Sequence, residues 1–231
     1  MIKNIIKNIY QIDLGVVNCY LIDDSGALTL IDTGVDGAEK KIFKALAEIG
    51  KKPTDLKQII LTHLHPDHAG SAAVIQQMLN IPVYAHYTDA ALIEKGIGMR
   101  EPMTRTPGFI SWLVYSLLLK KAPKTITPVS NIIKLNDEQV LPILAGAKVI
   151  HSPGHSAGHI SLLIEKEELL IAGDICMNTN GLVDYSILYE DVTLAKQTLK
   201  NISKYNFKIA CFGHGKPVMS SASKKMTEKF S

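Results

Sequence analysis

Three histidines and one aspartate fall within six consecutive positions, in the run His63-Leu64-His65-Pro66-Asp67-His68. The run follows segment 58–61, a short apolar stretch that predicts a β-strand. Because residues two apart in an extended chain point to the same face, His63 and His65 can bind one metal ion together. Pro66 can begin a turn that brings Asp67 and His68 toward a second ion. Imidazole suits zinc and other first-row metals, so this run predicts a metal centre after a strand.

Strand and helix patterns alternate along much of the chain, which favours an α/β domain. Apolar runs bounded by turn residues predict strands at 18–22, 28–31, 83–85 and 208–212. Apolar residues at helical spacing predict helices at 38–49, 71–79 and 192–199. Segment 159–174 has the same outline as 19–32, because each is an apolar strand, a polar turn and an apolar strand that ends in aspartate. This similarity suggests two related halves packed face to face.

The segment between about 96 and 128 has a different character. Gly, Pro and Thr surround the bulky apolar block 109–119. We interpret the whole chain, 1–231, as one domain with a helical insertion at 96–128. Three roles for the block stay open: a core helix, a homodimer contact through the 109–119 helix, or a hydrophobic lid over the active site.

Composition and charge argue against several classes of protein. A formal charge of +3 on 231 residues is too small to indicate nucleic-acid binding without a clustered basic patch, so no nucleic-acid partner is expected. Lys224, Lys225 and Lys229 are interpreted as a solvated tail. The three cysteines have no paired spacing, which indicates a reducing compartment. The N-terminus has no signal-peptide core, and the longest apolar stretch is about half of the roughly 20 residues that a membrane span needs. We therefore expect a cytoplasmic protein without a membrane span.

Five motifs, in the expected order, resemble those of the metallo-β-lactamase superfamily and cover nearly the whole chain. They are the His-x-His-x-Asp-His run at 63–68, Ile31-Asp32-Thr33-Gly34, Ser152-Pro153-Gly154-His155, Ala172-Gly173-Asp174 and Gly213-His214-Gly215. The resemblance implies an α+β fold, a four-layer αβ/βα sandwich with two facing mixed β-sheets and outer helices. The metals would lie at one edge of this sandwich. The resemblance says much less about the substrate, because one fold hosts many reactions.

The resemblance also implies a ligand set for two divalent metal ions, of which Zn²⁺ is favoured over Mn²⁺ or Fe. His63, His65 and His155 would bind the first ion, Asp67, His68 and His214 the second, and Asp174 would bridge both. The ions would share a hydroxide whose pKa is lowered to about 7 and which attacks a polarised carbonyl. Asp67 is the candidate catalytic residue, since it can orient this nucleophile or pass a proton to the leaving group.

Other polar residues are predicted to support the site. Asp32 is expected to hold the ligand loop by hydrogen bonds. His159 and His151 flank the Pro-Gly-His element and are assigned supporting or structural roles, and His86 a structural one. Three tyrosines are candidate hydrogen-bond donors to a leaving group, with nothing in the sequence to choose among them: Tyr115, Tyr185 and Tyr189.

The implied ligand set favours a hydrolase that acts on a carbonyl-type bond of a small molecule, an ester, a thioester or a lactone. The apolar block 109–119 would suit a substrate with an acyl chain. True β-lactamases are exported and lack the bridging aspartate, and glyoxalase II enzymes add a C-terminal helical region for which the seventeen residues after His214 leave no room. Two alternatives stay open: a mononuclear-iron persulfide dioxygenase-like oxidoreductase, and a phosphodiesterase or nuclease.

Overall fold

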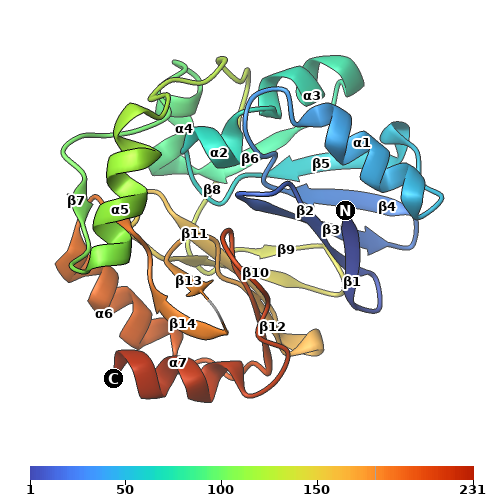
Figure 1. Ribbon diagram of the computed structural model, residues 1–231. Coiled ribbons are helices and arrows are strands. Elements are labelled where there is room, and N and C mark those ends of the chain that lie inside the picture. The colour runs from blue at the N-terminus through green and yellow to red at the C-terminus, as the bar shows by residue number, and fades with distance from the viewer. Residues whose placement is uncertain (180) are drawn as a thin grey trace.

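Two β-sheets face each other in the computed structural model, which describes residues 1–179 and 181–231 (Figure 1). Helices cover the outer face of each sheet, so that the layers follow one another as helix, sheet, sheet and helix. Residues 2–135 supply the strands of the first sheet, and residues 140–211 supply those of the second. The predicted four-layer αβ/βα sandwich with two mixed sheets is therefore confirmed.

The first sheet has the strand order β1-β2-β3-β4-β5-β6-β8. Four strands pair antiparallel in chain order: β1 (Ile2–Ile6), β2 (Ile9–Asp13), β3 (Asn18–Asp24) and β4 (Ala27–Ile31). Three further strands continue the sheet in parallel: β5 (Leu56–Ile60), β6 (Val83–His86) and β8 (Ile133–Leu135). Parallel neighbours need crossover connections. These carry the helices α1 (Glu39–Glu48), η1 (Pro53–Asp55), α2 (Pro66–Ala69), α3 (Ala72–Leu79) and α4 (Tyr87–Ile93).

The second sheet has the strand order β16-β12-β11-β10-β9. Antiparallel pairing joins β9 (Val140–Leu141), β10 (Ala147–His151), β11 (Ile160–Ile164) and β12 (Leu169–Ile171), and β16 (Ile209–Cys211) is parallel to β12. The remaining elements of this half are η3 (Glu165–Glu167), the hairpin of β13 (Cys176–Thr179) and β14 (Leu182–Tyr185), and the helices α6 (Val192–Ile202) and α7 (Ala222–Phe230). The strands predicted at 18–22, 28–31, 58–61, 83–85 and 208–212 are β3, β4, β5, β6 and β16, each within two residues of the predicted bounds, whereas strands such as β1, β2 and β10 were not predicted.

Buried apolar side chains form three clusters, one between the sheets and one under each helical layer. Strand β3 shows how the chain fills two of them. Leu21 packs in the cluster under the helices, whereas Tyr20 and Ile22 pack in the cluster between the sheets. This alternation follows from the two-residue period of a strand. Because both faces of β3 are buried, the strand reads as a continuous apolar run.

The C-terminal residues form a packed helix rather than a tail, although the lysines predicted to be solvated are exposed. In α7, Ala222, Met226 and Phe230 are buried at a spacing of four residues, which places them on one face against the cluster shared with α6. Lys224 and Lys225 are exposed. The charged residues had suggested a tail, while the three spaced apolar positions carried the helical signal.

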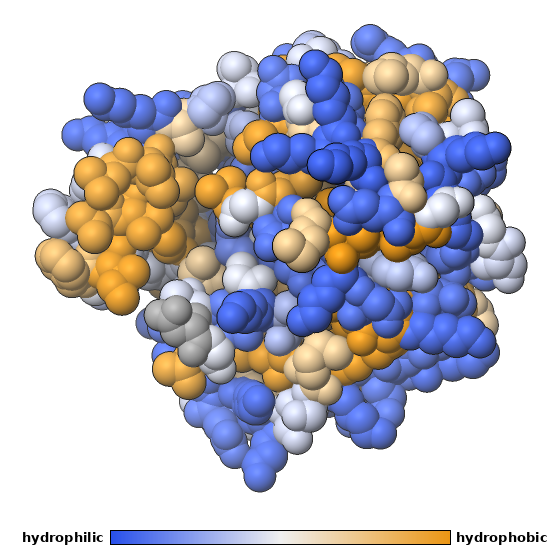
Figure 2. All heavy atoms as spheres, turned by 45° about the vertical axis from the view of Figure 1, so that its right-hand side comes forward, coloured by the Kyte–Doolittle hydropathy of each residue, from blue (hydrophilic) through white to orange (hydrophobic). Residues whose placement is uncertain are grey.

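The segment 96–128 contains the helix α5 (Phe109–Leu117), the 3-10 turn η2 (Leu119–Lys121) and the short strand β7 (Thr104–Arg105), which pairs with β15 (Leu188–Tyr189). Ser111 is the buried residue of α5, so the core-helix interpretation was wrong. Figure 2 shows a broad apolar patch at the left side of the molecule, where Figure 1 places α5. Within the described part of the chain, no helix is both long enough and apolar enough to cross a membrane.

Candidate metal centre

Loops that follow four strands carry the seven predicted ligands. His63 and His65 follow β5, His155 follows β10, Asp174 follows β12, and His214 follows β16. Strands β10, β12 and β16 run in one direction, so their C-terminal ends lie at the same edge of the second sheet. Pro66 begins the one-turn helix α2 rather than a turn, a position that its fixed φ suits. Asp67 and His68 lie on this helix.

The folded chain brings all seven side chains together at the edge of the sandwich. Potential ligand atoms lie within 4.8 Å of one another in three groups: His63, His65 and His155; His63, His68 and Asp174; and Asp67, His68 and His214. The first and third groups match the two histidine-containing sets that the resemblance implied. Residues up to about 150 positions apart therefore meet at one place, as a shared centre requires.

Asp174 lies between the two sets. Its Oδ2 is 3.0 Å from Nε2 of His214, 3.4 Å from Nε2 of His68 and 3.6 Å from Nε2 of His155. The carboxylate thus approaches histidines of both sets at once. A single aspartate in this position can give one oxygen to each of two cations.

Five atoms of this cluster are buried without a hydrogen-bond partner among the described residues. They are Nε2 of His63, His65, His68 and His155, and Oδ1 of Asp174. Leaving one such atom unsatisfied costs about 1–3 kcal/mol, so five at one place need a common partner. Imidazole nitrogens and a carboxylate oxygen are the donor set of a zinc or related first-row ion. The residues therefore fit a metal ion.

Hydrogen bonds on the opposite ring nitrogen orient the histidines. In His68, Nδ1 lies 2.8 Å from Oδ2 of Asp32. In His155, Nδ1 lies 2.9 Å from the carbonyl oxygen of Leu188. In His214, Nδ1 lies 2.6 Å from the carbonyl oxygen of Val16. Each partner accepts, so Nδ1 carries a proton in each ring and Nε2 is the nitrogen that faces the cluster.

Asp32 forms hydrogen bonds that can hold the ligand loop in position. Besides His68, its carboxylate accepts hydrogen bonds from the backbone nitrogen and the hydroxyl of Thr62, at 2.7 and 2.8 Å. Its φ of 60° lies in the left-handed region, which is uncommon for a residue with a side chain. Asp32 therefore links the end of the first sheet to the residues on both sides of the His63 loop.

His159 and two glycines shape the surroundings of Asp174. The backbone nitrogen of Asp174 donates to Nε2 of His159 at 2.9 Å, while Nδ1 of His159 contacts the Ser152 hydroxyl. This bond uses the nitrogen that could otherwise bind a metal, which agrees with a supporting position. Any side chain at Gly213 would overlap the Asp174 carboxylate, and a Cβ at Gly173 would come within 2.6 Å of His159.

Burial and charge divide the cluster into two electrostatic halves. Burial lowers the pKa of His65 to about 4 and that of His155 to about 3, so both rings are neutral at pH 7. Burial lowers the pKa of His214, but the carboxylates of Asp174 and Asp67 outweigh this effect and raise the pKa to about 10. Burial also opposes the ionisation of Asp174, but His214 and His68 hold the pKa of this carboxyl well below its ordinary value. A cation entering this half would displace protons, so metal binding should weaken at low pH.

Asp67 and His214 are the members of the cluster that reach solvent. The side chain of Asp67 is 32% exposed and that of His214 is 25% exposed, whereas those of His68, His155 and Asp174 are nearly or fully buried. Oδ2 of Asp67 lies 3.3 Å from Nε2 of His214. A molecule that approaches the cluster from solvent therefore meets these two side chains first.

Tyr189, one of the three candidate donors to a leaving group, is buried. Its hydroxyl donates to the Ile175 carbonyl oxygen, so it is not free to donate to a leaving group.

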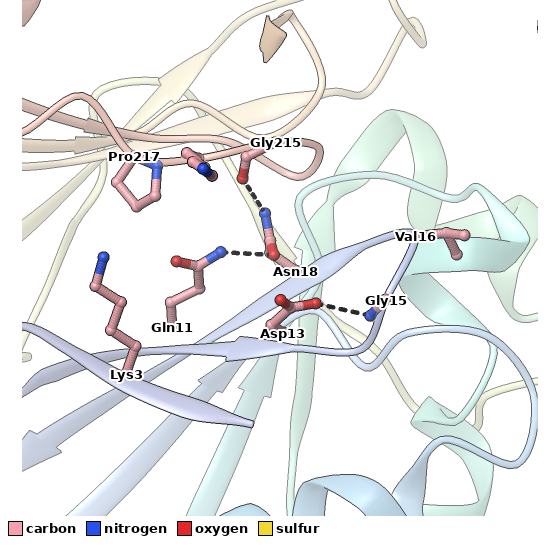
Figure 3. A pocket seen from close by; sticks show the side chains of 9 residues that line it. Lys3, Gln11, Asp13, Gly15, Val16, Asn18, Gly215 and Pro217 are labelled. Carbon is pink, nitrogen blue, oxygen red and sulfur yellow. Dashed lines mark hydrogen bonds between the residues drawn. The ribbon is translucent and has the colours of Figure 1, made fainter. Parts of the chain in front are cut away.

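A cavity of about 280 Å³ lies beside the loop that carries His214 (Figure 3). In its wall, Gln11 donates to the side-chain oxygen of Asn18, at 2.6 Å. Asn18 in turn donates to the carbonyl oxygens of Phe212 and Gly215, on both sides of His214. The cavity is lined by none of the seven predicted ligands. The hydrogen bonds of Gln11 and Asn18 in its wall hold the His214 loop in place.

A charged network that sequence reasoning missed ties two ligand loops together. Asp89 is fully buried and accepts hydrogen bonds from the backbone nitrogen of Leu64, the hydroxyl of Ser156 and the guanidinium of Arg100. Arg100 also approaches Glu190, which accepts from the backbone nitrogen of Ala157. The three charged residues of the network, Asp89, Arg100 and Glu190, belong to none of the five motifs. Asp89 lies three residues after the end of strand β6, and this position was the available signal.

Removing Arg100 should destabilise the protein strongly. Arg100→Ala leaves the buried Asp89 carboxylate without its charge partner, and breaking a buried pair costs about 3–5 kcal/mol. For a chain of this size, the lower value corresponds to a melting temperature about 6–12 °C lower. Thermal and urea unfolding measure the change. Lys124→Ala is the matched control, because its ion pair with Glu101 is exposed and is worth less than about 1 kcal/mol. Equal stability of the two variants would show that the network does not anchor the fold.

His86 lies outside the metal cluster and stacks on His151, with ring centroids 4.0 Å apart. Its side chain is buried, and in the described part of the chain its Nε2 has no hydrogen-bond partner. Burial, aided by the charge of His151, lowers the pKa of His86 to about 4, although Asp89 and Asp137 oppose this. Both histidines thus have the structural positions that we predicted for them.

Neutral His86 should make the fold sensitive to acid. In the unfolded chain a histidine titrates at about 6.5, so between pH 6.5 and 4 the unfolded state binds more protons and the folded state loses stability. The loss attributable to His86 approaches about 3 kcal/mol at pH 4. We expect His86→Asn to reduce the drop in unfolding free energy between pH 7 and pH 4 by this amount, in urea titrations of metal-free protein. The other buried histidines contribute equally to the pH dependence of the parent protein and of the variant. Parallel pH profiles would contradict the assignment.

Comparisons with known proteins were consistent with this geometry. Residues 12–214 match the family model of the metallo-beta-lactamase superfamily. The protein YflN of Bacillus subtilis (strain 168), a probable metallo-hydrolase, is 29% identical over 171 residues, which is 73% of this chain and 64% of that relative. The chain thus spans less than two thirds of that relative's length. An N-acyl homoserine lactonase of Bacillus thuringiensis is 25% identical over 85% of this chain and 80% of the lactonase. A metallo-beta-lactamase family protein from Thermus thermophilus superimposes with a TM-score of 0.72 and 25% identity, over 97% of this chain and 79% of that one.

Proposed function

This chain belongs to the metallo-beta-lactamase superfamily, and from that premise we propose that it is a hydrolase with two divalent metal ions. Its substrate would be a small molecule with an ester, thioester or lactone bond. One observation carries the proposal: Asp174 lies within 3.6 Å of histidines from both ligand groups. A site for one ion would need no such shared carboxylate. The family matches and the histidine and aspartate cluster support a metal-dependent hydrolase in general, and the position of Asp174 supports two ions.

We assign His63, His65 and His155 to the first ion and Asp67, His68 and His214 to the second, with Asp174 contributing to both. Five of the seven donors are imidazole nitrogens, which favours Zn²⁺ over Mn²⁺ or Fe. Asp32 and His159 would keep the ligands in place through the hydrogen bonds described above.

The ions, when bound, would supply an activated water and a positive charge that polarises a carbonyl oxygen. Among the residues of the chain, Asp67 is best placed to move the proton. Its side chain is partly exposed, and its Oδ2 lies 3.3 Å from Nε2 of His214. We assign to this oxygen the acceptance of a proton from the attacking water and its transfer to the leaving oxygen or sulfur. Burial keeps His65 and His155 neutral at pH 7, and we assign to these two rings only the holding of an ion.

The choice of a carbonyl substrate is supported by the likeness to a lactonase over most of its length. A mononuclear iron centre, as in the dioxygenase alternative, would need the first group alone, whereas Asp67, His68 and His214 form a complete second group. Neither alternative function has an observation of its own in its favour.

A substrate panel tests the proposal. The panel contains an N-acyl lactone, an aryl ester, an alkyl thioester and a bis-aryl phosphodiester, each given to zinc-loaded protein and to the Asp174→Asn variant. We expect hydrolysis of at least one carbonyl substrate, and none above background by the variant. Hydrolysis of the phosphodiester alone would contradict the proposal. So would oxygen consumption with a persulfide in place of hydrolysis.

A further inference from the structure

Helix α5 and the residue after it present large apolar side chains to solvent. We call this surface the α5 face, and its residues with their exposed fractions are Phe109 (73%), Ile110 (64%), Trp112 (50%), Leu113 (37%), Leu117 (69%) and Leu118 (61%). Figure 2 shows the corresponding apolar patch at the edge of the molecule. Exposed apolar side chains that occur singly are normal, but a contiguous group on one helix indicates an interaction surface.

The segment that carries the α5 face is strongly basic. Residues 102–136 contain Arg105, Lys120, Lys121, Lys124 and Lys134 and no aspartate or glutamate, which gives this stretch a formal charge of +5. The whole chain has 25 basic and 22 acidic residues, so the remainder carries 20 and 22 and a formal charge of −2. The net positive charge of the protein is therefore concentrated in the segment that carries the α5 face, although Lys124 is paired with Glu101, which lies just outside this segment.

We propose that the α5 face docks on an anionic lipid surface. An interfacial helix combines apolar side chains that enter the lipid with lysines that contact the headgroups, and aromatic residues favour the level of the headgroups. Phe109 and Trp112 supply the aromatic side chains, and Lys120 and Lys121 of η2 directly follow the helix. Charge decides between the lipid surface and a second copy of the chain. Two copies joined through this face would bring two +5 segments together, whereas anionic headgroups neutralise the charge.

The α5 face is joined to the metal centre by a short structural route. Strand β7, just before the helix, pairs with β15, where Leu188 lies opposite Arg105. The carbonyl oxygen of Leu188 accepts the hydrogen bond that orients His155. Docking would therefore place the metal centre close to the lipid surface. The docking proposal does not depend on the reaction that the centre catalyses.

The single tryptophan makes the proposal directly measurable. Trp112 is the one tryptophan of the chain and lies within the α5 face, half exposed. Purified protein is titrated with vesicles of phosphatidylcholine alone, or with 30% phosphatidylglycerol, in 50 mM and 500 mM NaCl. With the anionic vesicles at low salt, we expect the Trp112 emission to move to shorter wavelength and the protein to float with the vesicles. Phosphatidylcholine alone and high salt should each weaken binding strongly.

Paired variants separate charge from apolar contact. Lys120→Ala with Lys121→Ala should lower the partition coefficient about 25-fold, because each lysine near an anionic surface contributes roughly fivefold. Its control is Lys224→Ala with Lys225→Ala, two exposed consecutive lysines on α7, which should leave binding unchanged.

The apolar contact is tested by Phe109→Ser with Leu117→Ser, which should lower vesicle binding by about tenfold or more. Its control is Met78→Ser, an exposed apolar residue on α3. All these side chains are exposed, and each variant retains Trp112 as the reporter.

Three results would overturn the proposal. The first is no shift and no flotation with anionic vesicles at low salt and lipid in excess. The second is an emission that is already at short wavelength without vesicles, together with a dimer in sedimentation equilibrium, which would assign the α5 face to a second copy. The third is equal loss of vesicle binding in the α5 variants and their α7 and α3 controls.

Discussion

Asp174→Asn should lower the hydrolytic rate by at least about 10³-fold and remove most of the bound metal. The asparagine keeps the shape of the side chain but loses the negative charge, and its amide nitrogen cannot bind a cation. Because Oδ2 of Asp174 approaches His68, His155 and His214 together, both metal positions should suffer. The rate is measured on whichever substrate of the panel is hydrolysed fastest, and metal is measured by elemental analysis of the same samples.

His86→Asn is the control for this substitution. His86 is buried like Asp174, but it stacks on His151 outside the cluster. We expect this variant to keep its metal and nearly its full activity at pH 7. If Asp174→Asn remained as active as the parent protein, the model of a centre with two ions and a bridging carboxylate would be wrong.

Removing the metal should lower the melting temperature by about 10 °C. Ligands that bind only the folded state stabilise it by mass action, by about 4 kcal/mol when their free concentration is a thousand times the dissociation constant. For a chain of this size, 1 kcal/mol corresponds to roughly 2–4 °C. The structural reason is the set of five buried ligand atoms that lack a hydrogen-bond partner among the described residues. Differential scanning calorimetry before and after chelation, and after zinc is added back, gives the shift.

Asp174→Asn serves here as the comparison protein. Since it should hold little metal, its melting temperature should change far less on chelation. An unchanged melting temperature in the parent protein, with metal loss verified by elemental analysis, would mean that the cluster does not hold a stabilising ion.

Much of the fold could be predicted because the strands and helices of each layer have a recognisable pattern of apolar residues in the sequence. Strands buried on both faces read as apolar runs, as in β3, and helices with one buried stripe show apolar spacings of three and four, as in α1. The candidate ligands were named through the five motifs, and the structure brings them within reach of one another. Their role as metal ligands stays a prediction that the experiments above address.

What could not be predicted depends on contacts between distant segments. The Asp89 network joins residues that are 11 to about 100 positions apart, and no single stretch of sequence shows that Leu64, Ser156 and Arg100 share one carboxylate. The exposure of α5 is a property of its surroundings too. Its all-round apolar sequence also suits a buried helix, and only the packing shows that its large side chains face solvent.

The most direct measurement is the metal content of protein purified without added metal, determined by inductively coupled plasma mass spectrometry. The cluster contains two groups of ligand atoms, and Oδ2 of Asp174 approaches histidines of both, so we expect about two zinc or manganese ions per chain. About one iron ion per chain, with no second metal taken up on addition of zinc, would contradict the centre proposed here.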